Sequence, residues 1–193
     1  MKTMGRIKSE WPDFEKNEDL ALLIGLVLGD GHIESYPRSE GLEIALGTDK
    51  PLLISFTFDL VERVFHKCPA MAKQKTNCVK IRIYEKYIAK RLEVPTGNRR
   101  YSKQGIPGWI WKKRSFLINC LRGLYEAEAS LSVHLPTCTY NFAFHNTSER
   151  LLRDVYMVLV KLGLHPEVRP VAIRIRRKDE VKYLCNLLSF RKY

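Results

Sequence analysis

An apolar segment near the start of the chain recurs in altered form about a hundred residues later, and this repeat limits the folds available. The first copy, residues 20–33, reads LALLIGLVLGDGHI, and the second, residues 116–131, reads FLINCLRGLYEAEASL. Both have the length and apolar spacing of a helix. Each carries two small residues four positions apart, followed directly by an acid: Gly25, Gly29 and Asp30 in the first copy, and Gly123, Ala127 and Glu128 in the second.

The repeat extends beyond these segments and predicts two related halves. The two acids lie 98 residues apart, and His66 and His165 lie 99 residues apart. In each half the spacing of apolar residues predicts the order helix, two strands, helix, two strands, helix. In the first half these elements are a helix at 19–29, strands at 32–36 and 42–48, a helix from 51, strands at 71–75 and 78–84, and a helix at 85–92. In the second half they are a helix at 116–127, strands at 130–135 and 139–146, a helix ending at 162, two strands within 167–176, and a helix at 179–188.

The chain therefore divides into an N-terminal extension (1–18), a first subdomain (19–94), a linker (95–114) and a second subdomain (115–193). Residues four apart share one face of a helix, so the small residues of each copy form a bare stripe. Glycine in a helix interior costs about 0.5–1 kcal/mol relative to alanine, and close contact between two helices is the simplest reason to keep it. We expect the two stripes to face each other, giving a monomer whose halves imitate a homodimer.

The positive charge of the chain indicates the kind of molecule that it binds. Its net charge is +12 and its pI is about 9.6, values that indicate a polyanion, either nucleic acid or an anionic membrane surface. The apolar runs are too short to span a bilayer, and residues 1–19 resemble neither a secretory nor an organelle-import signal. We expect an intracellular protein that binds no membrane. The five cysteines show no CxxC spacing, which argues against a zinc site or a disulfide framework.

Asp30 and Glu128 carry the predicted chemistry. Each stands at the C-terminal end of its helix, where the macrodipole disfavours a negative charge by about 0.3–1 kcal/mol. If the helices pair, the two carboxylates also repel each other. A divalent cation would offset both effects, and paired acids in a basic protein suit metal-assisted hydrolysis of a phosphodiester. The alternative is that both acids are exposed helix ends without a role.

Alternation along the strands predicts a basic surface in both halves. In CVKIRIY, residues 78–84, and VAIRIRR, residues 171–177, apolar side chains alternate with basic ones, so one face is expected in the core and the other in contact with nucleic acid. For any single residue, a merely solvated position is the alternative. The candidate DNA-binding residues are Glu34, Tyr36, Arg38, Glu43, Lys73, Lys75, Asn77, Lys80, Arg82, Tyr84, Ser132, His134, Tyr140, Asn141, Arg169, Arg174 and Arg176.

The segments LIGLVLGDG (23–31) and LRGLYEAEA (121–129) resemble the two motifs of the LAGLIDADG homing endonucleases. The resemblance covers about residues 19–190. It implies an α+β fold with pseudo-twofold duplicated αββαββα halves, two saddle-shaped antiparallel sheets on the DNA major groove, and a central two-helix interface. Ala129 replaces the closing glycine of the motif, which allows a different exit from the second helix.

The resemblance also implies site residues. The last acids of the motifs, Asp30 and Glu128, would bind divalent metal with help from the backbone carbonyls of Gly29 and Ala127. The metal would be Mg²⁺ or Mn²⁺, and Ca²⁺ would support binding without cleavage. Further catalytic positions implied by family members are Arg82 and Arg174, in place of the usual lysines, and Asn146, with Thr48 as a weaker match in the first half.

These features predict a site-specific endonuclease that makes a double-strand break in a long asymmetric DNA target. Two alternatives use the same fold. One is an RNA-binding maturase that acts on its own intron RNA, and the other is a non-catalytic DNA-binding regulator. Acids in both motifs favour the nuclease.

Overall fold

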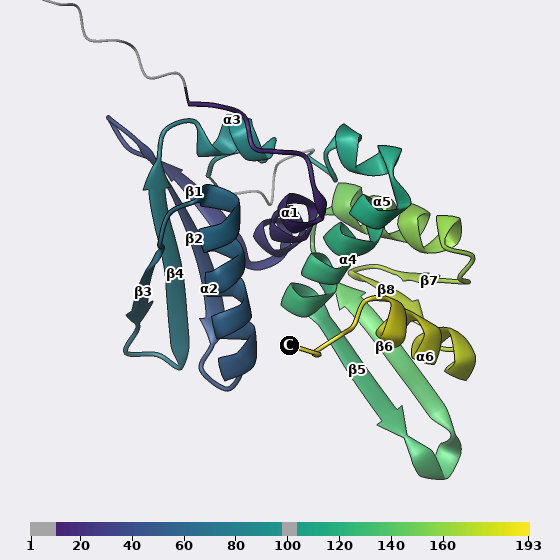
Figure 1. Cartoon of the computed structure of the whole chain (residues 1–193). Coiled ribbons are helices and arrows are strands. Elements are labelled where there is room, and N and C mark those ends of the chain that lie inside the picture. The colour runs from purple at the N-terminus through teal and green to yellow at the C-terminus, as the bar shows by residue number, and fades with distance from the viewer. Residues whose placement is uncertain (1–10, 98–103) are drawn as a thin grey trace, which may run out of the picture.

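A computed structural model describes residues 11–97 and 104–193. The start of the expected N-terminal extension and the middle of the expected linker lie outside the described residues. The architecture is α+β, with two four-stranded antiparallel sheets that flank a central pair of helices (Figure 1). None of the helices in the described ranges is long and apolar enough to cross a membrane.

The two halves repeat the same order of elements, as the sequence predicts. The first half contains α1 (Glu18–Asp30), β1 (Gly31–Ser35), β2 (Glu40–Gly47), α2 (Pro51–Phe65), β3 (Ala70–Lys73), β4 (Cys78–Glu85) and α3 (Ile88–Leu92). The second half contains α4 (Arg114–Glu128), β5 (Ala129–His134), β6 (Thr139–His145), α5 (Glu149–Lys161), β7 (Glu167–Arg169), β8 (Ala172–Ile175) and α6 (Lys178–Leu187). Short 3₁₀ turns, η2 (Gly108–Lys112) and η3 (Leu135–Thr137), complete the described elements.

Side-chain caps begin two of the six α-helices in the described ranges. The Asn17 side chain accepts a hydrogen bond from the Leu20 N–H and caps α1, and Ser148 does the same for α5 through the Leu151 N–H. A cap by Ser115 on α4 is also plausible from sequence, but the structure shows otherwise. The helix begins one residue earlier, and the Ser115 hydroxyl donates instead to the Glu18 carboxylate of the first half, at 2.8 Å.

The central helices α1 and α4 pack backbone against backbone through the small residues. A Cβ atom built on Gly25 would overlap the carbonyl oxygen of Cys120, and one built on Gly123 would overlap the carbonyl oxygen of Leu22. Farther along, the same construction on Gly29 meets the Ala127 side chain. The predicted two-helix interface is therefore confirmed, and α1 is buried along nearly its whole length, from Leu20 to Leu28.

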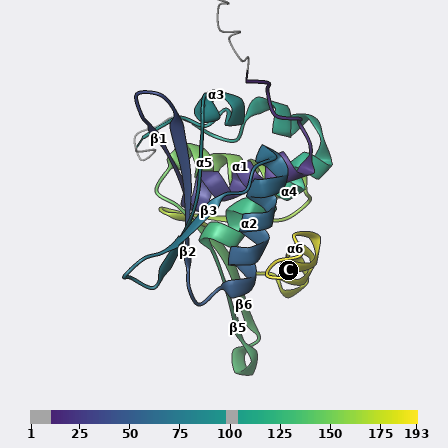
Figure 2. The same ribbon diagram turned by 60° about the vertical axis from the view of Figure 1, so that its left-hand side comes forward.

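Both sheets have the same topology. Their strand orders are β1-β2-β4-β3 and β5-β6-β8-β7, and every neighbouring pair is antiparallel. The β5–β6 hairpin extends beyond the helices (Figures 1 and 2), and most of β5 is exposed. One face of each sheet packs on helices, and the other, called here the outer face, carries polar side chains.

The register corrects two of the residues expected on the outer faces. Lys73 pairs with Val79, a buried residue, so its side chain lies on the helix side of the first sheet. Tyr140 also points to the helix side, where Lys178 of α6 lies 5.8 Å from its ring centre. Successive residues of a strand face opposite sides of the sheet, and the face that a residue takes in one strand cannot be carried across a turn to the next strand. The prediction for Lys73 is wrong for this reason. Tyr140 and Asn141 are neighbours in β6 and cannot share a face.

The end of the expected linker is an ordered part of the core. Trp109 and Ile110 in η2 are buried, and the Trp109 ring meets Phe116 of α4 edge-on. The Ile106 N–H donates to the buried carboxylate of Asp154 in α5, at 2.8 Å. This segment therefore connects the first half to the helix layer of the second.

Candidate functional site

The two acids of the repeated motif occupy equivalent helix ends. Asp30 is the last residue of α1 and Glu128 the last of α4, and the next residue begins a strand in both halves. The exits are nearly identical, with φ and ψ of −86° and 159° at Gly31 and of −92° and 148° at Ala129. Replacing the closing glycine by alanine has therefore not changed the exit, because neither residue has a positive φ.

The packing of the seam brings these helix ends together. A Cβ atom at Gly29 would lie 3.2 Å from the Cγ atom of Glu128. Glu128 thus lies against the residue that precedes Asp30. Asp30 and Glu128 therefore lie at the same end of the α1–α4 pair, directly before β1 and β5.

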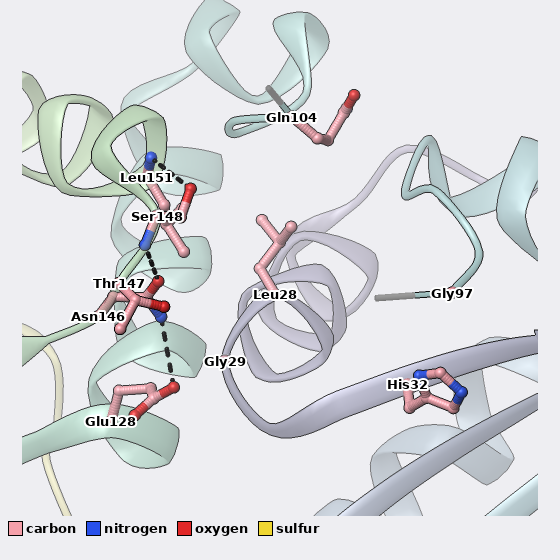
Figure 3. A pocket seen from close by; sticks show the side chains of 10 residues that line it. All are labelled: Leu28, Gly29, His32, Gly97, Gln104, Glu128, Asn146, Thr147, Ser148 and Leu151. Atoms are coloured by element: carbon pink, nitrogen blue, oxygen red, sulfur yellow. Dashed lines mark hydrogen bonds between the residues drawn. The ribbon is translucent and has the colours of Figure 1, made fainter. Parts of the chain in front are cut away.

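A cavity of about 480 Å³ opens beside this end of the seam (Figure 3). Its walls come from the end of α1, the end of α4, the loop between β6 and α5, and the residues on either side of the undescribed linker segment. The lining residues are Leu28, Gly29, His32, Gly97, Gln104, Glu128, Asn146, Thr147, Ser148 and Leu151.

Asn146 links Glu128 to the start of α5. Its side-chain amide donates to the Glu128 carboxylate at 3.3 Å, and its Oδ1 atom accepts from the Ser148 N–H at 2.9 Å (Figure 3). The Asn146 backbone N–H donates to Val171 in the turn between β7 and β8. The Asn146 side chain is therefore hydrogen-bonded through both of its polar atoms, one of them to the Glu128 carboxylate.

Thr48 takes the place of Asn146 in the first half. Its backbone N–H donates to Asn77, in the turn between β3 and β4, just as Asn146 bonds to the turn between β7 and β8. The two halves therefore differ chemically at this position, because a threonine hydroxyl stands where the second half has a carboxamide.

The donor atoms at the seam suit a hard divalent cation. Mg²⁺ and Mn²⁺ favour carboxylate oxygens together with water and phosphate oxygens, and Asp30 and Glu128 supply two carboxylates at adjoining helix ends. Within residues 11–97 and 104–193, no three side chains of His, Cys, Asp or Glu gather as a ready-made metal site. An ion at this place would need backbone carbonyl, water or phosphate oxygens to complete its shell.

Arg82 and Arg174 lie on the outer faces of the sheets and do not line the cavity with Glu128. Arg82 donates to the Glu43 carboxylate at 2.6 Å, and Lys80 pairs with the same carboxylate, also at 2.6 Å. Burial would raise the pKa of Glu43, but its bonds with Lys80 and Arg82 outweigh burial and hold the pKa below its usual value.

The second sheet repeats this arrangement. Glu167 pairs with Arg174 at 2.9 Å and with Arg169 at 3.3 Å. The hydrogen bond from Arg174 lowers the pKa of Glu167. Each outer face thus has one carboxylate bound by two basic side chains, which keeps the basic groups fixed in place and reduces their net charge.

The remaining candidate DNA-binding residues fall into three groups. Within the outer faces lie Glu34, Tyr84, Ser132, His134 and Asn141. In turns or beyond strand ends lie Tyr36, Arg38, Lys75, Asn77 and Arg176. Lys73 and Tyr140 lie on the helix side, as described above.

Several residues near the cavity and the end of α4 are not predicted from the sequence. Gln104 and His32 line the cavity, but neither belongs to a repeated pattern. Glu126 is buried two residues before Glu128 and accepts hydrogen bonds from the end of the chain. Such long-range contacts leave no local signal, although a glutamate between buried residues of a helix is itself a hint.

Comparison with known proteins agrees with this geometry. Residues 115–193 match the sequence family described as LAGLIDADG-like domain. Among curated proteins, a sequence search finds no match. Among solved structures, the homing endonuclease I-DmoI in complex with DNA and Mn has a TM-score of 0.62 and 18% identity, covering 89% of this chain and 97% of that one. The N-terminal LAGLIDADG domain of DUF199/WhiA has a TM-score of 0.61 and 14% identity, covering 91% of this chain and 83% of that one.

The fold and the central helix pair are those shared by the LAGLIDADG structures I-DmoI and WhiA. Residues 115–193 are similar to the LAGLIDADG-like domain family, and about nine-tenths of the chain superposes on the LAGLIDADG fold. I-DmoI structures exist with Mn, with Mg and with Ca, each in complex with DNA. Identities this low establish the fold, and the fold is shared by I-DmoI and by WhiA, so activity must be argued from the site.

Proposed function

We propose that this protein is a site-specific DNA endonuclease that hydrolyses phosphodiesters with the help of a divalent metal. The observation that carries the proposal is the seam. Direct contact of α1 and α4 places Asp30 and Glu128 at adjoining helix ends, between two sheets with polar outer faces. A merely structural pair of helices would not need an acid at the end of each.

Each part of the site has a distinct task. When bound, Mg²⁺ or Mn²⁺ supplies an activated water and stabilises charge on the phosphate. Asp30 and Glu128 would hold the ion, with the Gly29 and Ala127 carbonyls as further oxygen ligands, and Asn146 would orient the Glu128 carboxylate to which its amide donates. The outer faces bind the DNA, and their side chains read base edges in the major groove.

Arg82 and Arg174 are assigned to DNA contacts rather than to proton transfer. Arginine does not deprotonate in proteins and cannot serve as a base. Both guanidinium groups are also held by carboxylates on the outer faces. A phosphate that approaches either face could replace part of that pairing.

A single chain with both motifs supplies both acids, so we propose a monomer that acts inside the cell, where DNA is found. Ca²⁺ is expected to support binding without cleavage. An RNA-binding maturase and a non-catalytic DNA-binding regulator remain the other functions that the fold would allow.

The test is a selection of cleaved sequences from a random double-stranded DNA library, with Mg²⁺ or Mn²⁺ present and with EDTA. A single long asymmetric sequence recovered only with metal would support the nuclease. Specific binding to duplex DNA without cleavage under any divalent metal would favour the regulator. Binding to the protein's own intron RNA, with no selected DNA, would favour the maturase.

A further inference from the structure

The end of the chain crosses from the second half onto the first and bonds to the helix that carries Glu128. Residues 191–193, called here the strap, follow α6 after three intervening residues and end between α2 and the last turn of α4 (Figure 1). The Tyr193 ring lies 5.3 Å from the ring of Phe56 in α2. The strap therefore touches both halves beside the seam.

Glu126 is the point where the strap is fastened. Its side chain is buried, with only 3% of the residue exposed. It accepts a hydrogen bond from the Arg191 N–H at 2.7 Å and a short one from the Tyr193 hydroxyl. Burial, together with the bond to Glu126, raises the pKa of Tyr193, so its hydroxyl stays protonated and remains a donor.

A second contact fixes the strap one turn earlier. Arg122 of α4 donates to the Lys192 carbonyl at 3.0 Å, and its guanidinium lies 5.0 Å from the centre of the Phe56 ring. The strap, α2 and α4 thus share one set of contacts. They hold the last two turns of α4 against the first half.

Comparison with α1 shows that this fastening is not needed for packing alone. Leu28 stands at the corresponding place in α1, 98 residues before Glu126. An apolar residue is therefore sufficient to fill that position in one half. A buried carboxylate in the other half is costly unless it is hydrogen-bonded, as Glu126 is to Arg191 and Tyr193.

The strap also has a counterpart in the linker. Ile106, which follows the first half, donates its N–H to the buried Asp154 of α5 in the second half. Tyr193, at the end of the second half, reaches back to Phe56 of α2 in the first. Each half is thus tied to the other by the segment that follows it.

We infer that Glu126 is a positioning residue for Glu128, and that the Tyr193 hydroxyl and the Arg191 N–H hold it in place. The three residues Glu126, Ala127 and Glu128 form the end of α4, and Ala127 packs on Gly29 directly before Asp30. Fixing Glu126 therefore fixes the spacing of the two acids. This inference rests on the proposed nuclease function and adds a residue that does not touch metal or DNA.

The test compares Tyr193→Phe and Glu126→Ala with the wild type and with Tyr183→Phe as a matched control. The Tyr183 hydroxyl is bonded to Arg114 and has no contact with Glu126 in the described structure. We expect DNA affinity measured in Ca²⁺ to change less than about twofold, because the strap lies off the outer faces. We expect the cleavage rate at saturating DNA to fall about tenfold or more, since small misplacement of catalytic groups has effects of that size or larger.

The Mg²⁺ dependence of cleavage distinguishes misplacement of Glu128 from a smaller fraction of folded protein. The Mg²⁺ concentration for half-maximal cleavage should rise about tenfold in Tyr193→Phe, whereas a smaller folded fraction would lower the amplitude and leave that midpoint unchanged. Glu126→Gln keeps a carbonyl acceptor and should recover part of the rate lost in Glu126→Ala. Wild-type rate and midpoint in both Tyr193→Phe and Glu126→Ala would overturn the inference.

Hydrogen exchange provides a readout that does not need cleavage. If the strap positions the end of α4, Tyr193→Phe should speed amide exchange in the last turn of α4 and at the start of β5, but not in α5. If the wild type cleaves no DNA at all, the proposed function fails, and this exchange pattern still decides whether the strap holds α4. Unchanged exchange in Tyr193→Phe would show that it does not.

Discussion

Replacing Gly25 by alanine tests whether the two halves are joined by direct backbone contact. The new methyl group would overlap the Cys120 carbonyl oxygen and approach the Gly123 Cα atom to 3.0 Å. These are backbone atoms of α4, which cannot rotate away as a side chain would. The helices must separate, and the buried face of α1 must lose contact with its partner.

The expected cost follows from two opposing effects. Overpacking of a well-packed core costs about 1–3 kcal/mol, with the upper end appropriate where backbone atoms collide. Alanine would return about 0.5–1 kcal/mol through its better helix propensity. The net expectation is a loss of about 2 kcal/mol in the free energy of unfolding, which in a chain of this size lowers Tm by about 4–8 °C.

Chemical denaturation in urea measures this loss, and Gly108→Ala is the matched control. A Cβ atom at Gly108 would meet no atom within 4 Å, so that substitution should be neutral or slightly stabilising. Cleavage of the selected DNA target should fall in Gly25→Ala beyond the loss of folded protein, because the acids move apart with the helices. A Gly25→Ala protein as stable as Gly108→Ala would refute the close contact.

Four further predictions concern the site and the outer faces. Asn146→Ala should weaken the effect of Mg²⁺ on cleavage by about 10- to 100-fold, as loss of a group that orients a metal ligand typically does, and an unchanged metal titration would remove Asn146 from the site. Arg174→Ala should weaken DNA binding and reduce its salt dependence by about one unit of slope, while the rate at saturating DNA stays near wild type; a larger effect on rate than on affinity would restore a catalytic role. Burial raises the pKa of Glu43, but its bonds with Lys80 and Arg82 outweigh burial and lower that pKa, so these ion pairs stabilise the fold at neutral pH and are lost as pH falls through the folded-state pKa. Glu43→Gln should therefore reduce stability at pH 7 and flatten its decline in acid, and an unchanged acid limb in unfolding scans would contradict this. Lys73→Ala should leave DNA affinity nearly unchanged compared with Lys80→Ala, because Lys73 lies on the helix side of its sheet, and equal losses would show that DNA reaches that side as well.

Much of the fold is available from the sequence because its signals are local and repeated. The small-residue stripes predict the helix seam, and the polar side chains of Asn17 and Ser148 cap the helices that begin beside them. Alternation in the strands containing Arg82 and Arg174 places these side chains correctly on the outer faces. In each case neighbouring residues alone decide the outcome.

Other features depend on contacts between distant residues. Ser115 could have capped its own helix, but Glu18 from the other half offers its hydroxyl a charged acceptor. The sequence analysis groups Lys73 with the basic residues near it. Its pairing with Val79, however, places its side chain on the helix side of the sheet. The hydrogen bond between Tyr193 and Glu126 joins residues 67 positions apart, and no sequence pattern near either residue predicts it.

The candidate site is predictable to a similar degree. Asp30 and Glu128 follow from the repeat, and their shared helix ends follow from the packing of the stripes. The cavity wall formed by Gln104, and the bond from Asn146 to Glu128, require the three-dimensional arrangement of the linker and of the loop after β6. Whether these groups act in catalysis remains a prediction for experiment.

The central claim is that Asp30 and Glu128 form one metal-dependent centre for cutting DNA. The most direct measurement compares the wild type with Asp30→Asn and Glu128→Gln, alone and combined, on the DNA target recovered by selection. We predict that each variant binds this target in Ca²⁺ with wild-type affinity and cuts it at less than about 1% of the wild-type rate in Mg²⁺, the scale expected when a group acting at the transition state is lost. Cleavage by the combined variant at the wild-type rate would contradict the claim.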